Sequence, residues 1–519
     1  LHKEYRRQRQ MCIRDRGNDV YENQELPVVA SDVDCILLTH AHIDHSGLIP
    51  LMYVNGFRGQ VYSTSATAQL CEIMLRDSAH IQMFEAEWRN RKAARSGGKL
   101  KEFVPLYDMD AAVNVCKQFV GCEYDKIYNI ADGIKIRFTD VGHLLGSASI
   151  EVWATEKTEN GDVTEKIVFS GDIGNINKPI IKDPKHVTDA DYVVMESTYG
   201  NRSHGGTPNY VEDLTNIFKR TFERGGNVVI PSFAVGRTQE LLYIIRKIKE
   251  DNLVGRDFDV YMDSPLAIEA TNIFIKNVES CFDDEAVELV RKGINPLSFP
   301  GLKYATTGDE SKQINFDPNP KVIISSSGMC EAGRIRHHLK HNLWRPECTI
   351  VFVGYQAVGT TGRIIVDGAE EIKLFGEPIQ IKAEIVQLKG SSGHADKDGL
   401  LCWINAFDRK PKKVFVVHGE DSVCDEFTEC LKEEYGYDAM APYTGGSYDL
   451  IADRVISEGV KERKTRRTTS TQRGKTVFDR LVAAGKRLMT VITHNEGGTN
   501  KDLAKFTDQI NALCDKWDR

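Results

Sequence analysis

The sequence predicts an α/β protein. Short apolar, β-prone runs recur along the chain, and several of them end in a glycine-containing turn that carries histidine or aspartate. From about residue 207 these runs alternate with helical patterns, which is typical of a parallel sheet covered by helices. At 519 residues the chain fits two or three domains rather than a single core.

The composition narrows the class of protein. Hydrophobic residues make up 41% of the chain and charged residues 27%, as in ordinary globular proteins. We find no apolar run long enough for a membrane span and no signal-peptide pattern, so neither a membrane nor secretion is predicted. Twelve cysteines without a Cys-x-x-Cys pair indicate reduced thiols and a cytoplasmic location. Because the net charge is -8, any grip on nucleic acid has to come from local basic patches and bound metal.

The chain begins with a basic run over residues 1–16 that has no apolar period. It resembles a translated sequencing adapter more than a nucleic-acid-binding arm, so we expect native sequence from residue 17. Residues 17–206 alternate apolar strands with helical stretches such as 66–88, and they are expected to form the first part of one domain. The polar, basic segment 89–101 is expected to be an exposed linker.

A strand predicted over residues 35–38 leads into the densest group of metal-competent side chains. In an extended loop, His40 and His42 point to the same side and can share one ion. Asp44 and His45, which follow directly, can then face a second ion. Two metals about 3.5–4 Å apart can stabilise both the attacking and the leaving oxygen in a hydrolysis. The alternative is a surface loop that happens to be rich in histidine.

Three later strands also end at candidate ligands, namely His143 after 136–141, Asp172 after 166–170 and His418 after 413–417. Taken singly, His143 or His418 is explained by a structural role. Open sheets place their sites at the carboxyl ends of strands, however, so the joint pattern favours one metal centre. Asp172, held between glycines, is suited to bridge two cations. The histidines outside this arrangement are given no metal role.

Residues 207–369 predict a second domain, with strands at 227–230, 259–262 and 322–324 and a helix at 237–249. The turn Ser326, Ser327 and Gly328 follows a strand and can cradle a phosphate with its amides and hydroxyls. Arg237 opens a helix whose amino end favours anions. Serines at a strand end are equally well explained as turn and capping residues.

Residues 370–448 return to the strand pattern of the first domain, and residues 449–519 form a tail. The basic stretch 461–475 is expected to be a solvated linker rather than a strap that contacts RNA. The last helix carries an apolar face. This face has to pack on a neighbouring helix, on the body of the protein or on the second subunit of a homodimer.

Together these motifs resemble the metallo-β-lactamase superfamily, through His-x-His-x-Asp-His at 40–45, Gly-His at 142–143, Ser-Gly-Asp at 170–172 and Val-His-Gly at 417–419. Three further segments resemble its RNA-processing branch, the β-CASP ribonucleases that include the cleavage and polyadenylation endonucleases. They are Met-Glu-Ser-Thr-Tyr-Gly at 195–200, Pro-Ser-Phe-Ala-Val-Gly-Arg-Thr-Gln-Glu at 231–240 and Ser-Gly-His-Ala-Asp at 392–396. The likeness covers roughly residues 19–448.

The resemblance implies an αββα sandwich with an inserted β-CASP domain, a parallel sheet in that domain, and a C-terminal helical tail. It also implies two zinc ions, one held by His40, His42, His143 and Asp172 and the other by Asp44, His45, Asp172 and His418. In the family's pattern His394 is the general acid for the leaving oxygen and Glu196 orients a site histidine. Ser392 would contact a phosphate oxygen, and Asp44 counts among the catalytic residues as well as the ligands.

One departure from the family concerns the start of the chain. Members usually begin with strands that end in Asp-Cys-Gly, and nothing before Asp34 supplies these here. We expect that the native start has been replaced by the adapter-like leader. The missing aspartate supports the metal loop in the family, so the chain as written is expected to bind metal less firmly.

The expected function is a zinc-dependent ribonuclease that acts on single-stranded RNA in RNA processing or decay. It would cut endonucleolytically and leave a 5'-phosphate and a 3'-hydroxyl. Two alternatives stay open: a dizinc hydrolase of a small ester, thioester or lactam, and a non-catalytic scaffold subunit of an RNA-processing complex. The inserted domain argues against the first, and the filled ligand positions argue against the second.

Overall fold

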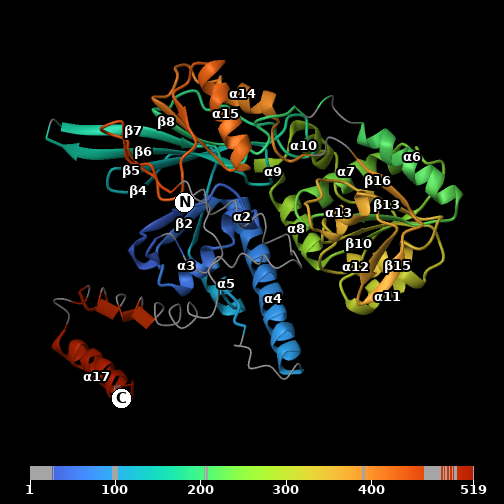
Figure 1. Cartoon of the computed structure of the whole chain (residues 1–519), viewed down its shortest axis with the longest axis horizontal. Helices are drawn as coiled ribbons and strands as arrows, with labels where there is room; N and C mark the ends of the chain where they lie inside the picture. Colours follow the sequence, from blue (N-terminus) through green and yellow to red (C-terminus); the bar gives the residue numbers. More distant parts are fainter. Residues whose placement is uncertain are drawn as a thin grey trace.

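The structure, a computed structural model, describes Leu26 and residues 28–95, 103–159, 161–203, 205, 209–388, 392–460 and, with short gaps, 481–517. Two sheet-based domains lie side by side in these ranges (Figure 1). The predicted leader, residues 1–16, and the basic stretch 461–475 lie outside the described residues.

The first domain contains two sheets. The larger has seven strands in the order β18-β17-β8-β7-β6-β5-β4. Their bounds are β4 Tyr128–Ala131, β5 Ile134–Asp140, β6 Ala148–Thr158, β7 Gly161–Phe169, β8 Tyr192–Glu196, β17 Lys413–Val417 and β18 Ala439–Met440. The smaller sheet is parallel, with β2 Gln60–Thr64 between β1 Cys35–Leu37 and β3 Phe119–Cys122.

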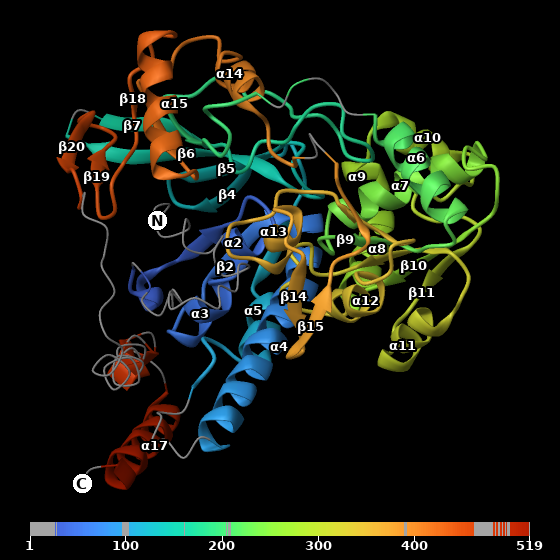
Figure 2. The same ribbon diagram turned by 45° about the vertical axis from the view of Figure 1, so that its right-hand side comes forward.

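Helices cover the outer faces of these two sheets. On the smaller sheet they are α3 Ile49–Val54, α4 Ser65–Arg95 and α5 Met109–Cys116, with the short α2 Ile43–Ser46 against α4. On the larger sheet they are α14 Lys397–Ile404 and α15 Asp421–Glu433 (Figures 1 and 2). Between the sheets, Phe138 and Ile150 of the larger sheet and Cys122 of the smaller share one buried cluster. The first domain therefore has the αββα layering that the sequence predicts.

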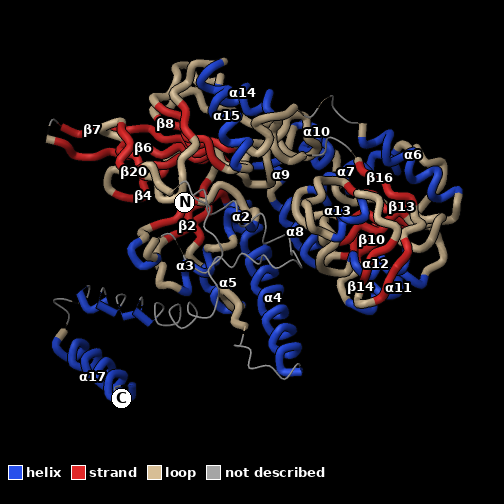
Figure 3. Tube along the Cα trace, in the orientation of Figure 1, coloured by secondary structure: helices blue, strands red, loops and turns tan. Residues whose placement is uncertain are grey.

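The second domain is built on a six-stranded parallel sheet in the order β11-β10-β12-β9-β13-β16. The strands are β9 Val228–Pro231, β10 Asp259–Asp263, β11 Leu302–Tyr304, β12 Lys321–Ser325, β13 Thr349–Phe352 and β16 Glu384–Gln387. The helices around it are α6 Tyr210–Glu223, α7 Arg237–Glu250, α8 Pro265–Lys276, α9 Val278–Cys281, α10 Asp284–Arg291, α11 Gly308–Phe316, α12 Ile335–Asn342 and α13 Thr361–Val366. Every residue of β9, β12 and β13 is buried, because helices cover both faces of a parallel sheet. Figure 3 shows the strands gathered in two groups, one in each domain.

The second sheet extends further along the chain than the sequence analysis expected. The predicted second domain ends at residue 369, whereas β16 pairs with β13 in this sheet. The antiparallel hairpin of β14 Glu371–Leu374 and β15 Glu377–Gln380 packs into the same buried cluster. We therefore propose that the chain returns to the first domain only after β16.

The expected linker over residues 89–101 is partly helical instead. Helix α4 continues to Arg95, because arginine, lysine and alanine favour helix and dominate residues 91–95. Helix α4 packs against α8 of the second domain, so it forms part of the contact between the two domains (Figure 2).

The described part of the tail contains a short hairpin, β19 Ser447–Asp449 with β20 Arg454–Ser457, and the last helix, α17 Asn500–Trp517. Side chains of its apolar face are exposed in the single chain, including Leu513 and Trp517. A partner for this face, such as a second subunit, stays a prediction. None of the helices in the described ranges combines the length and the apolarity that a bilayer span requires.

Candidate metal centre

Five strand ends of the first domain come together at one edge of its sheets. His40 and His42 follow β1, His143 follows β5, Asp172 follows β7, Glu196 ends β8 and His418 follows β17. Asp44 and His45 lie on the short helix α2, directly after the β1 loop. The structure thus brings all seven predicted ligands to one place, although the chain separates the first from the last by 378 positions (418 minus 40).

Two of the turns need glycine. Gly142 and Gly171, just before His143 and Asp172, have φ of +63° and +61°, a conformation that other residues rarely adopt. Gly174 donates from its backbone N to the carbonyl of Val141 at 2.8 Å. A Cβ at Gly174 would lie 2.0 Å from the carbonyl oxygen of Gly142, so only glycine lets these two loops approach so closely.

The first group of donors contains three imidazoles and one carboxylate. Nδ1 of His42 lies 3.1 Å from Nε2 of His40 and 3.1 Å from Nε2 of His143. Oδ2 of Asp172 lies 3.5 Å from Nε2 of His40 and 3.6 Å from Nε2 of His143. Ligands on a tetrahedral zinc are about 3.3 Å apart, which follows from zinc to nitrogen bonds of about 2.0–2.1 Å. These four atoms have the spacing of one coordination shell.

The second group joins His45 and His418 through their Nε2 atoms, which are 3.2 Å apart. Nε2 of His418 lies 3.6 Å from Oδ2 of Asp44. The other oxygen of Asp172, Oδ1, lies 3.3 Å from Nε2 of His45. Asp172 therefore turns one oxygen toward each group.

The buried carboxylate of Asp172 indicates that this donor set fits metal. Its side chain is 2% exposed, and Oδ1 accepts no hydrogen bond from any described residue. A buried acceptor without a donor is costly, and the cost is removed when the oxygen coordinates a cation. Imidazole and carboxylate are ligands that zinc accepts readily, so the residues present fit the metal that the resemblance implies.

His394 lies beside this cluster and is held by Glu196. Nδ1 of His394 is 3.1 Å and 3.0 Å from the two oxygens of Glu196, which is buried at the end of β8. Because carboxylate oxygens accept, Nδ1 donates. Nε2 then faces the cluster, 3.7 Å from Oδ2 of Asp172. Glu196 also accepts at 2.6 Å from the backbone N of Ile173, next to Asp172, so it orients both the histidine and the metal loop.

The chain is similar to known proteins over most of its length. A family model described as the Beta-Casp domain matches residues 238–365, and one described as the Zn-dependent metallo-hydrolase RNA specificity domain matches residues 378–442. The chain is 35% identical over 390 residues to ribonuclease TTHA0252 of Thermus thermophilus, an alignment that covers 75% of this chain and 82% of the relative. The chain belongs to the β-CASP ribonuclease family of the metallo-β-lactamase superfamily.

Two other relatives extend the comparison. An RNase J-like protein of Methanocaldococcus jannaschii is 31% identical, over 76% of this chain and 84% of the relative. The transcription termination factor FttA of Methanosarcina mazei is also 31% identical, over 79% of this chain but only 62% of the relative. The β-CASP chain thus matches about three fifths of the length of that factor. The family membership makes this chain a hydrolase. The description of the matched RNA specificity domain, a Zn-dependent metallo-hydrolase domain, indicates that the family uses metal.

Contacts around the β-CASP metal centre orient its histidines. Nδ1 of His143 donates to the carbonyl of Gly393 at 3.1 Å, which leaves Nε2 for the cluster. Nδ1 of His418 lies 3.1 Å from Oγ1 of Thr198. The sequence pattern did not predict Gly393 and Thr198 as supporting residues. Both are close in sequence to predicted site residues, and this proximity is the signal in the sequence that could have identified them.

Of the predicted phosphate contacts, Ser392 lies at the site, where its Oγ accepts from the backbone N of His394 at 3.1 Å. Ser326, Ser327 and Gly328 lie at the carboxyl end of β12 in the β-CASP domain. Oγ of Ser326 donates to Oγ of Ser264 at 3.0 Å, and Oγ of Ser327 accepts from the backbone N of Ala332 at 3.4 Å. These bonds fit the capping interpretation of the serines, and their contact with phosphate stays a prediction.

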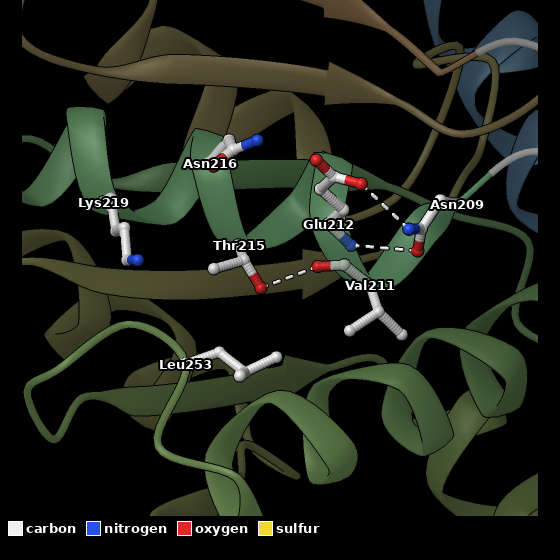
Figure 4. A pocket seen from close by; sticks show the side chains of 7 residues that line it. All are labelled: Asn209, Val211, Glu212, Thr215, Asn216, Lys219 and Leu253. Atoms are coloured by element: carbon white, nitrogen blue, oxygen red, sulfur yellow. Dashed lines mark hydrogen bonds between the residues drawn. The ribbon is translucent and has the colours of Figure 1, made fainter.

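A pocket in the β-CASP domain lies along helix α6, away from the metal centre. It has a volume of about 240 Å³ and is lined by Asn209, Val211, Glu212, Thr215, Asn216, Lys219 and Leu253 (Figure 4). Nδ2 of Asn209 donates to the carboxylate of Glu212 at 2.9 Å, and Oγ1 of Thr215 donates to the carbonyl of Val211 at 2.6 Å. Because these polar groups serve the helix itself, we assign the pocket no role in the site.

Burial keeps the histidines of the first group neutral. It lowers the pKa of His42 to about 4 and the pKa of His40 and His143 well below the usual range. Burial opposes ionisation of Asp172, but the neighbouring His418 and His45 hold its pKa well below that of an ordinary aspartate. At neutral pH the first group therefore offers three neutral imidazoles and an ionised carboxylate, the protonation states that bind a divalent metal.

These shifts predict that acid destabilises the metal-free protein between about pH 6.5 and 4. In this window an unfolded chain protonates His42, whose pKa in the folded state is about 4, so the unfolded state binds more protons and stability falls as pH falls. Each such histidine contributes up to about 1.4 kcal/mol per pH unit. We expect the melting temperature of chelator-treated protein to fall from pH 7 to pH 4.5, and to fall less steeply in His42→Gln. If the melting temperature of His42→Gln fell with pH as steeply as that of the parent, the lowered pKa of His42 in the folded state would be contradicted.

Proposed function

We propose that this chain hydrolyses phosphodiester bonds of single-stranded RNA with two zinc ions bound at the seven side chains described above. The observation that carries the proposal is the placement of Asp172 between two groups of donors, with His394 beside it. The ribonuclease names of relatives that match three quarters of the chain support RNA as the substrate. Free cysteines in the described ranges support the reducing cytoplasm as its location.

In this proposal His40, His42, His143 and Asp172 hold one zinc, and Asp44, His45, Asp172 and His418 hold the other. Bound zinc would supply a nucleophile at neutral pH and stabilise negative charge on the phosphoryl oxygens. The buried, ionised Asp172 fixes the distance between the two donor groups. The low pKa of the first three histidines keeps their ring nitrogens available as donors.

His394 is proposed as the general acid for the departing 3' oxygen. A ring with protons on both nitrogens keeps the Nδ1 proton for Glu196 and has the Nε2 proton to give. Ser392 would hold a phosphate oxygen next to it, because its hydroxyl is fixed by the backbone N of His394. RNA would extend toward the β-CASP domain, where the turn of Ser326 to Gly328 and Arg237, whose Nη1 already pairs with Glu240, are the proposed phosphate contacts. Cleavage within the strand would leave a 5'-phosphate and a 3'-hydroxyl.

The experiment is a substrate panel with zinc-loaded protein: linear and circular single-stranded RNA, duplex DNA and a chromogenic lactam. We expect both RNAs to be cut with the end groups named above, and the other two to stay intact. Cutting of the circular RNA tests the endonucleolytic mode, because a circle offers no end to an exonuclease. Elemental analysis of the same sample is expected to give two zinc ions per chain.

Chelator-treated protein is the control, and reloading it with zinc is expected to restore cleavage. Hydrolysis of the lactam alone would replace the proposal with a small-substrate hydrolase. No hydrolysis of any substrate by protein that holds two zinc ions would favour a non-catalytic scaffold. Cleavage of linear RNA only would keep the ribonuclease and remove the endonucleolytic mode.

A further inference from the structure

A buried lysine links the metal centre to the other domain. Lys178 lies in the loop between β7 and β8, and its Nζ donates to the main-chain carbonyl of His143 at 3.0 Å. The same ammonium lies 3.2 Å from Oε1 of Glu240, on the first turn of α7 in the β-CASP domain. The side chains of Lys178 and Glu240 are 12% and 10% exposed. One cation therefore contacts a candidate metal ligand in one domain and a carboxylate in the other.

The position of this ion pair is not explained by stability alone. Taking two charges out of water is costly, and an apolar pair of similar size is often as stable. Arg237, also mostly buried, pairs with the second oxygen of Glu240 at 2.5 Å, so the network carries two cations and one anion. Although this network of three charged groups is costly to bury, it is suited to hold the His143 loop at a fixed position relative to α7.

The loop that carries Lys178 is attached to the β-CASP domain just beyond it. The carbonyl of Ile180 accepts from the backbone N of Asp283 at 2.7 Å, and the backbone N of Lys182 donates to the carbonyl of Cys281 at 3.3 Å. On its other side Lys178 is close to Gly393, where a Cβ would lie 4.0 Å from Nζ and 3.4 Å from Cε1 of His143. Lys178 thus lies where the β-CASP domain, the His143 loop and the segment before His394 meet.

We propose that Lys178 is a positioning residue, which holds the His143 loop in place for metal and couples it to the β-CASP domain through Glu240. The inference rests on the proposed metal site but not on the identity of the substrate. His143 is held from two sides, by Lys178 at its carbonyl and by Gly393 at its ring. Without the ammonium, the buried carbonyl loses a donor. Gly142 has a left-handed φ, so the peptide that follows it can then rotate and displace His143.

The test measures zinc affinity without RNA, by competition with a chromophoric chelator. A His418→Ala background isolates the first group, and a His42→Ala background isolates the second. In the first background we expect Lys178→Met to weaken zinc binding about 10- to 100-fold, the range known for residues that orient metal ligands. Glu240→Gln is expected to weaken it in the same direction but less, because Lys178 keeps its bond to His143. Affinity in the second background is expected to stay unchanged.

The matched control is Lys182→Met. Lys182 is four positions further along the same loop, and its Nζ donates to the carbonyl of Ser280 at 2.8 Å rather than to His143. It is expected to leave both affinities unchanged. Because Glu240 acts through Lys178, the double variant Lys178→Met with Glu240→Gln is expected to lose no more affinity than Lys178→Met alone.

Three results would overturn the inference. One is an affinity within about twofold of the parent in both single variants, judged against the 10-fold minimum expected for an orienting residue. Another is an equal loss at both groups, which general destabilisation would produce. The third is independent, additive losses, which would remove the coupling through Glu240. If metal-free Lys178→Met does not fold by circular dichroism, Glu240→Gln decides alone. A parent that binds no zinc would refute the proposed function itself, whereas a parent that binds zinc but spares RNA would leave this test intact.

Discussion

Asp172→Asn is expected to cost the protein both zinc ions and to lower RNA cleavage at least about 10³-fold. The carboxylate of Asp172 faces Nε2 of His40 with one oxygen and Nε2 of His45 with the other. An asparagine of the same size puts a neutral amide among these imidazoles and can offer only one oxygen. Removing a single preorganised group that stabilises the transition state typically costs 10²- to 10³-fold, and here both metals would be affected.

Asp191→Asn is the matched control for this substitution. Asp191 is also largely buried and accepts from the backbone N of Lys166 at 2.9 Å, but it lies before β8 and outside the metal centre. We expect this control to change stability without changing the zinc content. Zinc content by elemental analysis and cleavage rate are measured on both variants. Two zinc ions bound to Asp172→Asn with the parent's affinity would refute the bridging role.

The sequence alone located much of the candidate site, because strand ends carry predictable information. Each apolar run before His143, Asp172 and His418 is a strand of the structure. In a mixed sheet, strands that run in the same direction have their carboxyl ends at the same edge. The spacing of His40, His42 and His45 is local, so it required no knowledge of tertiary contacts. Their approach to within a few ångströms follows from these two facts together.

Features that depend on long-range pairing were not predictable in the same way. Strand β16 is short and only half-buried, so nothing in its own pattern assigns it to the sheet of β13 rather than to the first domain. Lys178 lies in a polar loop, and its partner Glu240 is 62 positions further along the chain (240 minus 178). A single charged residue is more often solvated, and only the fold shows that this one is buried between two domains.

His394→Ala is expected to keep both zinc ions and to cut RNA about 10²- to 10⁴-fold more slowly, the usual contribution of a general acid. In the structure, proton donation by His394 is separate from metal binding. Nδ1 of His394 is bonded to Glu196, and the atoms near its Nε2 include Oδ2 of Asp172, but the seven candidate ligands complete both donor groups without it. The loss should therefore arise in protonation of the leaving oxygen.

A phosphodiester with an aryl leaving group tests this assignment, because an aryloxide departs without needing a proton. We expect His394→Ala to hydrolyse such an ester at nearly the parent rate while RNA cleavage is strongly impaired. Glu196→Gln should show the same selectivity in weaker form, since an amide oxygen can still accept from Nδ1 but carries no charge. If both variants lost the two activities equally, with zinc content intact, His394 would be acting through substrate placement rather than proton transfer. The leaving-group dependence thus distinguishes an acid catalyst from a structural neighbour of the metal centre.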